Sequence, residues 1–171
     1  MKHFVSFVAT VLIAIIGIEP VAFALGSKNA AYFGGTLTTF GNPKDPVEGR
    51  LDTTSETTLQ FAAIDRDFVG KNFSIPYAKI VDLEYGQKAG RRVGAAVGTT
   101  ILLGPIGLLS LFSKKRKHFL TIGFKDDADK DQVAVMELGK DIVRTTLAIV
   151  QTRSGKQIQY QDEEARKSAK D

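Results

Sequence analysis

Residues 93–112 contain no charged side chain, although they lie in the middle of a chain whose neighbouring segments alternate apolar and polar residues. Arg91 and Arg92 precede this apolar insert, and residues 114–117 read KKRK after it. A run of about 20 apolar residues is long enough to cross a bilayer, whereas alternation is typical of strands in a half-buried sheet. Any fold of this chain must therefore accommodate the insert between two groups of strands.

The segments around the insert predict a meander of about seven short strands. Alternation is clear in residues 59–63 and 120–124, and in residues 80–85 it places Val81, Leu83 and Tyr85 on one face. Pro76 cannot donate to a strand ladder, so its segment is expected at a sheet edge or before a bend. The remaining strands are expected at residues 32–37, 49–53, 73–77 and 132–138.

The period of the apolar residues changes near the C-terminus. From Ile142 to Val150 they recur at helical spacing, residues 139–141 offer a cap before them, and Gly155 is placed to end the helix. The segment 162–171 is charged enough to form a frayed tail. We therefore expect a mainly β (α+β) fold, a curled antiparallel sheet or small barrel with a C-terminal capping helix.

The N-terminus has the pattern of a secretory signal peptide. Lys2 precedes an apolar run at residues 4–18, and small residues follow at Ala22-Phe23-Ala24. We expect residues 1–24 to be removed, with an uncleaved anchor as the alternative, and residues 25–161 to form one exported domain, periplasmic or extracellular and membrane-associated. The chain has no cysteine, which excludes disulfides and thiolate chemistry, and its net charge of +4 favours anionic partners.

A meander of short strands closed by one helix resembles the bacterial pleckstrin-homology-like and GRAM-like domains. The resemblance covers roughly residues 49–155 and rests on FSIPYAKI at 73–80, VDLEYG at 81–86, HFLTI at 118–122 and the final helix. It implies a barrel-like sheet capped by the helix, and a binding or scaffolding module. No phosphoinositide-binding pattern is matched residue by residue, so the resemblance assigns no ligand site.

The insert is marginal as a single membrane span. Its ten large aliphatic or aromatic side chains contribute roughly −3 to −6 kcal/mol at a bilayer centre, before Gly, Thr, Ser and Pro subtract. A single span would also separate the strands before and after it. Gly104-Pro105 instead permits a hairpin with limbs at 94–103 and 106–112, and glycines at every fourth position from Gly86 to Gly98 allow close packing of one limb.

An apolar hairpin with basic residues at both feet is typical of two-signal membrane contact. Anionic phospholipid is therefore the partner that we expect. The predicted membrane-contact residues are Val97, Ile101, Leu102, Leu103, Ile106, Leu108, Leu109, Leu111 and Phe112. The predicted anionic-lipid-binding residues are Arg91, Arg92, Lys114, Lys115, Arg116 and Lys117.

Other interpretations of the insert stay open. It can pack on its own sheet, on a protein partner or on a second copy, which would make the chain a soluble interaction or self-assembly module. It can also help to enclose an apolar ligand in a carrier. Nucleic acid is not expected as a partner, because export removes the usual target and no aromatic residue interrupts the basic run.

The side chains argue against an enzyme. After residue 24 the chain keeps one histidine, His118, which we interpret as a solvated residue at a strand end. The acidic groups at residues 65–67 and 126–129 lack the spacing of a calcium loop and are interpreted as solvated turns. We therefore expect no metal and no cofactor.

Overall fold

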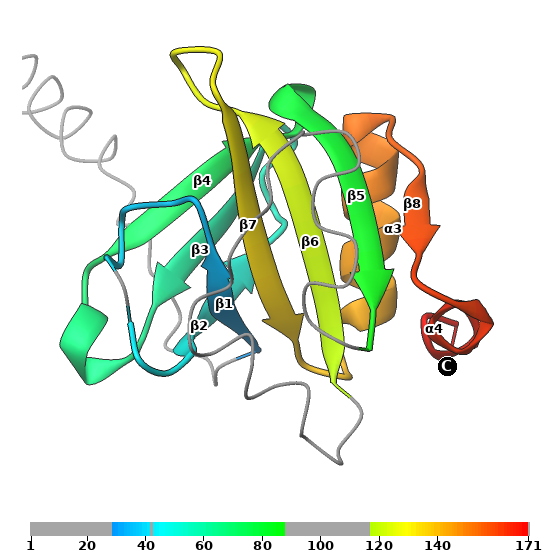
Figure 1. Ribbon diagram of the computed structural model, residues 1–171, viewed down its shortest axis with the longest axis horizontal. Helices are drawn as coiled ribbons and strands as arrows, with labels where there is room; N and C mark the ends of the chain where they lie inside the picture. Colours follow the sequence, from blue (N-terminus) through cyan, green and yellow to red (C-terminus); the bar gives the residue numbers. More distant parts are fainter. Residues whose placement is uncertain (1–28, 42, 88–116, 171) are drawn as a thin grey trace, which may run out of the picture.

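The structure is a computed structural model that describes residues 29–41, 43–87 and 117–170. In these residues eight strands form one sheet, with the order β4-β3-β2-β1-β7-β6-β5-β8 (Figure 1). The strands are β1 (Ala30–Gly35), β2 (Val47–Asp52), β3 (Thr58–Ala63), β4 (Asn72–Pro76), β5 (Ile80–Gly86), β6 (His118–Lys125), β7 (Asp131–Leu138) and β8 (Ile158–Tyr160). The helices are α3 (Val143–Ser154) and α4 (Glu163–Ser168), with short 3₁₀ turns η1 (Arg66–Phe68) and η2 (Tyr77–Lys79).

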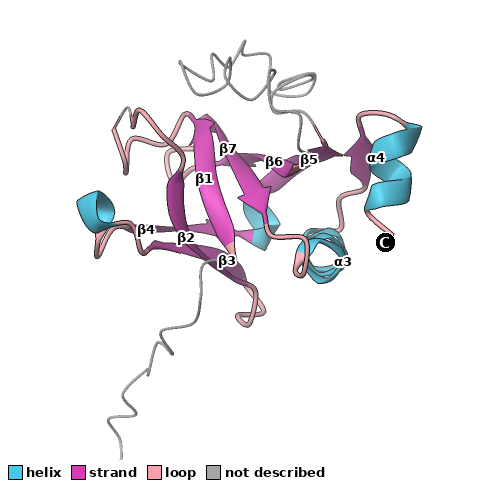
Figure 2. Cartoon of the chain, turned by 90° about the horizontal axis from the view of Figure 1, so that it is seen from below, coloured by secondary structure: helices cyan, strands magenta, loops and turns pink. Residues whose placement is uncertain are grey.

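The sheet is curled, and β1–β4 turn away from the plane of β5–β7 (Figure 2). All neighbouring strands are antiparallel except β8, which pairs with β5 in parallel. The expected fold class is confirmed: a mainly β, curled sheet with a C-terminal helix. The sheet has one strand more than the approximate number that we predicted, because residues Ile158–Tyr160 form a short strand that joins its edge beside β5.

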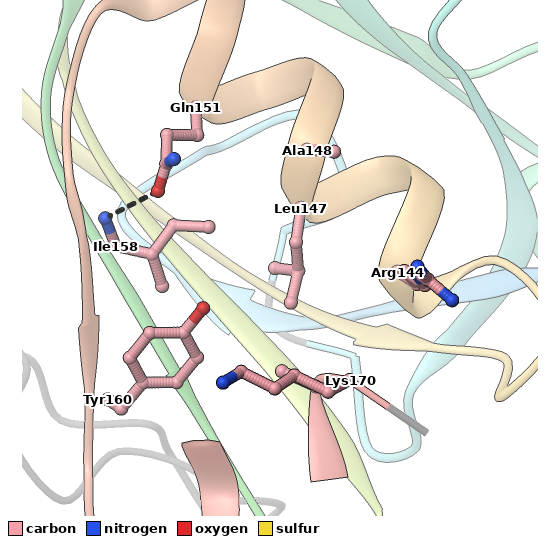
Figure 3. Close-up of a pocket in the computed structure, with 8 residues that line it drawn as sticks. Arg144, Leu147, Ala148, Gln151, Ile158, Tyr160 and Lys170 are labelled. Atoms are coloured by element: carbon pink, nitrogen blue, oxygen red, sulfur yellow. Dashed lines mark hydrogen bonds between the residues drawn. The ribbon is translucent and has the colours of Figure 1, made fainter. Parts of the chain in front are cut away.

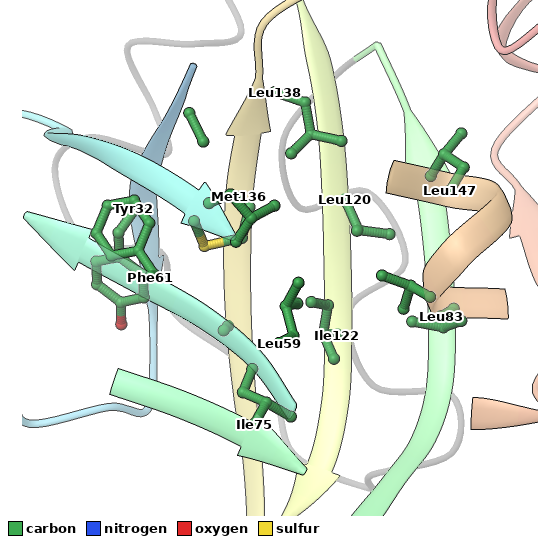
Figure 4. Packing of buried hydrophobic residues seen from close by; sticks show 14 of the residues in the cluster. Tyr32, Leu59, Phe61, Ile75, Leu83, Leu120, Ile122, Met136, Leu138 and Leu147 are labelled. Carbon is green, nitrogen blue, oxygen red and sulfur yellow. The ribbon is translucent and has the colours of Figure 1, made fainter. Parts of the chain in front are cut away.

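The core fills the concave side of the sheet (Figure 4). Strand alternation places Leu120, Ile122 and Phe124 of β6 there, as the sequence predicted. At the β1–β4 end, aromatic rings pack on one another: the ring centroids of Phe61 and Phe73 lie 5.3 Å apart in a stacked arrangement. Burial of such apolar side chains is the main stabilising contribution available to a chain without disulfides.

Strand β5 departs from the expected pattern at its start. The register with β6 shifts between Ile80 and Asp82, which marks an irregularity in the ladder. Ile80, Leu83 and Tyr85 are therefore buried in the core, whereas Val81 is only partly buried. Simple alternation from Val81 to Tyr85 was wrong at its first residue because a bulge changes which side chains share a face.

Helix α3 ends as predicted and begins differently. Gly155 adopts the left-handed conformation, φ 69°, and its N–H donates to the carbonyl of Gln151. The N-cap is Ile142, without a side-chain cap, and residues 139–142 form a turn in which the Ile142 N–H donates to the Gly139 carbonyl. The expected cap at residues 139–141 is therefore replaced by a backbone turn.

The expectation for Pro76 is confirmed, whereas the expectation for the C-terminal segment is not. Strand β4 is an edge strand that ends at Pro76, which confirms the expectation for that proline. The expectation of a frayed tail at 162–171 was wrong for residues 163–168, which form α4. Asp162 caps α4 by accepting the Ala165 N–H at 2.8 Å, and Ala165 is fully buried.

Arg153 ties the end of α3 to the turn between β2 and β3. Its guanidinium donates to the carbonyls of Thr53 and Ser55, the latter at 2.7 Å, and lies over the Tyr77 ring at 5.5 Å from the centroid. These contacts fix the last turn of the helix against the far end of the core.

We expect Arg153→Met to lower the free energy of unfolding by about 1–3 kcal/mol, because two partly buried carbonyls lose their donor. Lys156→Met, two residues beyond the helix at an exposed position, is the matched control and should stay within about 0.5 kcal/mol of the parent. Urea unfolding measures both. Equal effects of the two substitutions would contradict an anchoring role for Arg153.

Candidate functional site

The register of the sheet brings several chain segments to one end, which we call the insert end. Gly86, the last residue of β5, lies opposite Phe119 in β6. His118 lies opposite Leu138 in β7, and Ala30 at the start of β1 also lies opposite Leu138. The end of β5, the start of β6 and the start of β1 are therefore neighbours at the lower end of the sheet in Figure 1.

This pairing limits how the insert can meet a membrane. Strands β5 and β6 are paired from Ile80↔Phe124 to Gly86↔Phe119, so both lie on the same side of any bilayer. A single crossing by residues 93–112 would separate them and is incompatible with the sheet. Within the described ranges, no helix combines the length and apolarity that a bilayer crossing requires.

Of the predicted lipid-binding residues, the structure describes Lys117. Its Nζ lies 2.8 Å from Oε2 of Glu137 and 5.8 Å from the centroid of the Phe33 ring. This cation is therefore engaged within the protein. Outside the described residues lie the other predicted lipid-binding residues, Arg91, Arg92, Lys114, Lys115 and Arg116, and all the predicted membrane-contact residues, Val97, Ile101, Leu102, Leu103, Ile106, Leu108, Leu109, Leu111 and Phe112.

His118 is held in a hydrogen-bonded chain instead of being solvated. Its Nδ1 lies 2.6 Å from the Tyr85 hydroxyl, which in turn lies 3.2 Å from the Ser168 hydroxyl of α4. Burial and the nearby Lys140 charge lower the pKa of His118, although Glu137 acts in the opposite direction. A neutral imidazole accepts the Tyr85 proton at Nδ1, and the Tyr85 oxygen then accepts from Ser168. The expectation of a solvated histidine was therefore wrong.

A groove lies between α3, β8 and α4 (Figure 3). It has a volume of about 450 Å³, and Leu147, Ile158 and Tyr160 provide its apolar lining. Arg144 and Lys170, both exposed, lie along its rim. A second opening of about 540 Å³ shares Arg144 with it and continues past His118 and Lys140. Three exposed cations, Lys140, Arg144 and Lys170, therefore lie along these two openings, together with the exposed carboxylate of Asp141.

The acidic turns have structural roles. The Asp126 carboxylate accepts the Ala128 and Lys130 N–H groups, both at 2.9 Å, and these and other hydrogen bonds lower its pKa. Asp65 accepts the Asp67 N–H and caps η1. In the part of the chain that the structure describes, no three acidic or histidine side chains are grouped so that they could hold a metal ion.

Comparison with protein-family models, with curated proteins and with solved structures found no match for this chain. The site must therefore be interpreted from its own residues. Sequence reasoning missed the Tyr85–His118–Ser168 chain, because Ser168 lies in a segment that we expected to be frayed. It also missed the groove, whose wall at residues 158–160 gave only a weak strand signal.

The lowered pKa of His118 predicts a pH dependence of stability. Between its ordinary pKa of about 6.5 and its lower folded value, the unfolded chain binds a proton that the folded protein does not, so the free energy of unfolding falls as the pH decreases. His118→Gln keeps an acceptor for Tyr85 but cannot titrate. Urea unfolding at pH 7.5 and 5.5 should therefore show a smaller loss for this variant. Equal losses would exclude His118 as the cause.

Proposed function

We propose that this chain is an exported, non-enzymatic binding module with a pleckstrin-homology-like fold that attaches to an anionic membrane surface through its apolar insert. The observation that carries this proposal is the meeting of both insert flanks at one end of the sheet. The basic residues 91–92 follow Gly86 by five and six positions, and residues 114–116 precede His118 by two to four, so under this proposal both groups act together as a single cationic foot.

Two moderate contributions, one apolar and one electrostatic, together favour contact of the insert with an anionic membrane. The insert supplies an apolar transfer term of roughly −3 to −6 kcal/mol before polar residues subtract. Each basic residue near an anionic surface adds about 1 kcal/mol. The five basic residues other than Lys117 therefore match the apolar term, and neither contribution has to hold the protein alone.

The described surface supports the same orientation. Lys140, Arg144 and Lys170 are exposed around the openings near the insert end. Ala30 starts β1 at this end as well, so a retained N-terminal anchor would approach the membrane from the same side as the insert. Lys117 contributes less than the other basic residues, because Glu137 already compensates its charge.

Sedimentation with liposomes tests the proposal. The chain from Leu25 onward should pellet increasingly as the anionic lipid fraction rises and less as salt is added. The variant Lys114→Ser/Lys115→Ser/Arg116→Ser should bind on the order of 10²-fold more weakly, since three contributions of about 1 kcal/mol are lost.

The matched control removes three cations at the opposite end of the sheet, Lys79, Lys130 and Lys156, and should keep the parent affinity. Replacement of residues 93–112 by a Gly-Ser sequence should abolish pelleting with an unchanged far-UV spectrum. Binding that ignores lipid charge, salt and the basic triple substitution would rule out attachment to an anionic surface.

A further inference from the structure

The face of the sheet opposite the core is also buried. Alternation in β6 and β7 turns Leu120, Ile122, Ala134 and Met136 to the core, so the residues between them point the other way. These residues are nevertheless almost inaccessible. The exposed fractions are 2% for Phe119, 8% for Thr121, 1% for Val133 and 0% for Val135, and the neighbouring Phe33 of β1 is 3% exposed.

These five residues, Phe33, Phe119, Thr121, Val133 and Val135, form one continuous surface that we call the outer patch. Thr121 lies opposite Val135 in the β6–β7 register. The rings of Phe33 and Phe119 meet edge to face with centroids 4.9 Å apart, because Phe33 alternates with the core residue Tyr32 and therefore lies on the outer face. None of the five belongs to the core cluster.

The described helices do not account for this burial. Val143, Leu147 and Val150 of α3 belong to the core cluster on the concave side, and Ala165 of α4 does too. Helix α3 packs on η2, and α4 packs on β5 and β8. A valine on an open sheet face would be accessible to solvent, so the outer patch requires more cover than these two helices provide.

We propose that the outer patch is the docking surface for the chain's own apolar insert, residues 93–112. The chain that contains the insert leaves the sheet and re-enters it beside the patch, since β5 ends at Gly86, β6 begins at His118, and Gly86 lies opposite Phe119. The other undescribed segment, residues 1–28, is expected to lose residues 1–24 on export, which leaves only Leu25 to Lys28 from that side.

The dimensions fit this occupant. From Phe119 to Gly123 the patch extends along β6 by about 14 Å at 3.4 Å per residue. A helical limb of the length of residues 94–103 would measure about 15 Å. In the described residues Lys117 lies over the Phe33 ring at one margin of the patch, and the ten large apolar side chains of the insert match the apolar surface beyond it. A sheet with one face on the core and the other under the insert is a three-layer arrangement, in which apolar faces are buried on both sides.

The margin of the patch supports a cover that reaches β5. Glu84, opposite Thr121, is 6% exposed, and its carboxylate accepts the Gln161 amide N–H at 3.0 Å. Asp82, opposite Gly123, has one buried carboxylate oxygen without a hydrogen-bond partner. Burial raises the pKa of this carboxyl group, as expected where solvent is excluded from the edge of the patch.

This inference goes beyond the proposed function, because it concerns the protein in the absence of lipid. In this inference the insert binds an apolar surface of the protein itself, the outer patch. In the membrane proposal it binds the apolar interior of the bilayer. The two are tested by different readouts: lipid-free shielding of the patch tests docking, and pelleting with liposomes tests attachment.

The chain contains no tryptophan, so single reporters can be placed on each face of the sheet. In lipid-free buffer, Phe119→Trp should give a blue-shifted emission that iodide quenches weakly. When residues 93–112 are also replaced by a Gly-Ser sequence of equal length, the emission should shift to the red and quenching should rise severalfold. Phe61→Trp, in the core, is the matched control and should stay shielded in both backgrounds. If the indole introduced by Phe119→Trp stays shielded without the insert, the proposal is overturned.

A second measurement leaves the insert intact and therefore does not depend on folding of the replaced chain. The protein has no cysteine, so Val135→Cys can be combined with one cysteine at position 97, 101, 108 or 111. Mild oxidation in lipid-free buffer should form an intramolecular disulfide between Val135→Cys and at least one of these positions. In the control, Lys156→Cys at the opposite end takes the place of Val135→Cys, and no disulfide with the insert cysteines should form. Failure of all four insert positions to react would overturn the docking of the insert on the outer patch.

Discussion

The antiparallel pairing of β5 with β6 is the constraint on which the rest of the molecule depends. It joins the segments before and after residues 87–117 in one sheet, so the insert must return to the end from which it left. It also places Tyr85 beside His118, and through Ser168 it fixes α4 at the same end. Without this pairing, the outer patch would have no defined position relative to the two points at which the chain leaves and re-enters the sheet.

Much of the fold could be predicted, because the spacing of apolar residues indicates directly which segments form strands and which form the helix. The alternation at residues 59–63 and 120–124, the edge position of Pro76 and the helix end at Gly155 are local consequences of side-chain chemistry. The errors arose where tertiary structure overrides a local pattern. A bulge at Val81 changed the facing residues of β5, and the burial of Ala165 and Ala169 gave the charged C-terminal segment an anchor that composition alone does not reveal.

The candidate site was less accessible to sequence reasoning for a related reason. Strand β6 reads as half-buried, because Thr121 and Gly123 occupy alternate positions and only Phe119 is large and apolar among them. In the structure both faces of β6 are buried, whereas alternation of apolar and polar residues indicates burial of one face only. His118 looked solvated because four cations precede it in sequence, yet its side chain faces Tyr85 across the β5–β6 pair. Sequence neighbours and spatial neighbours differ most at strand ends.

The turn between β6 and β7 gives the domain a polarity in addition to its topology. Residues 125–131 hold four aspartates against two lysines, whereas residues 91–92 and 114–117, which in sequence follow β5 and precede β6, are all basic. Strand β6 separates the two ends by about 24 Å along its axis. Under the proposed attachment to an anionic surface, the four aspartates of this turn are repelled by the surface, which disfavours approach by the β6–β7 turn. Approach by the opposite end, where β5 ends and β6 begins, would then be favoured before contact, which would reduce the orientational search that limits most association rates.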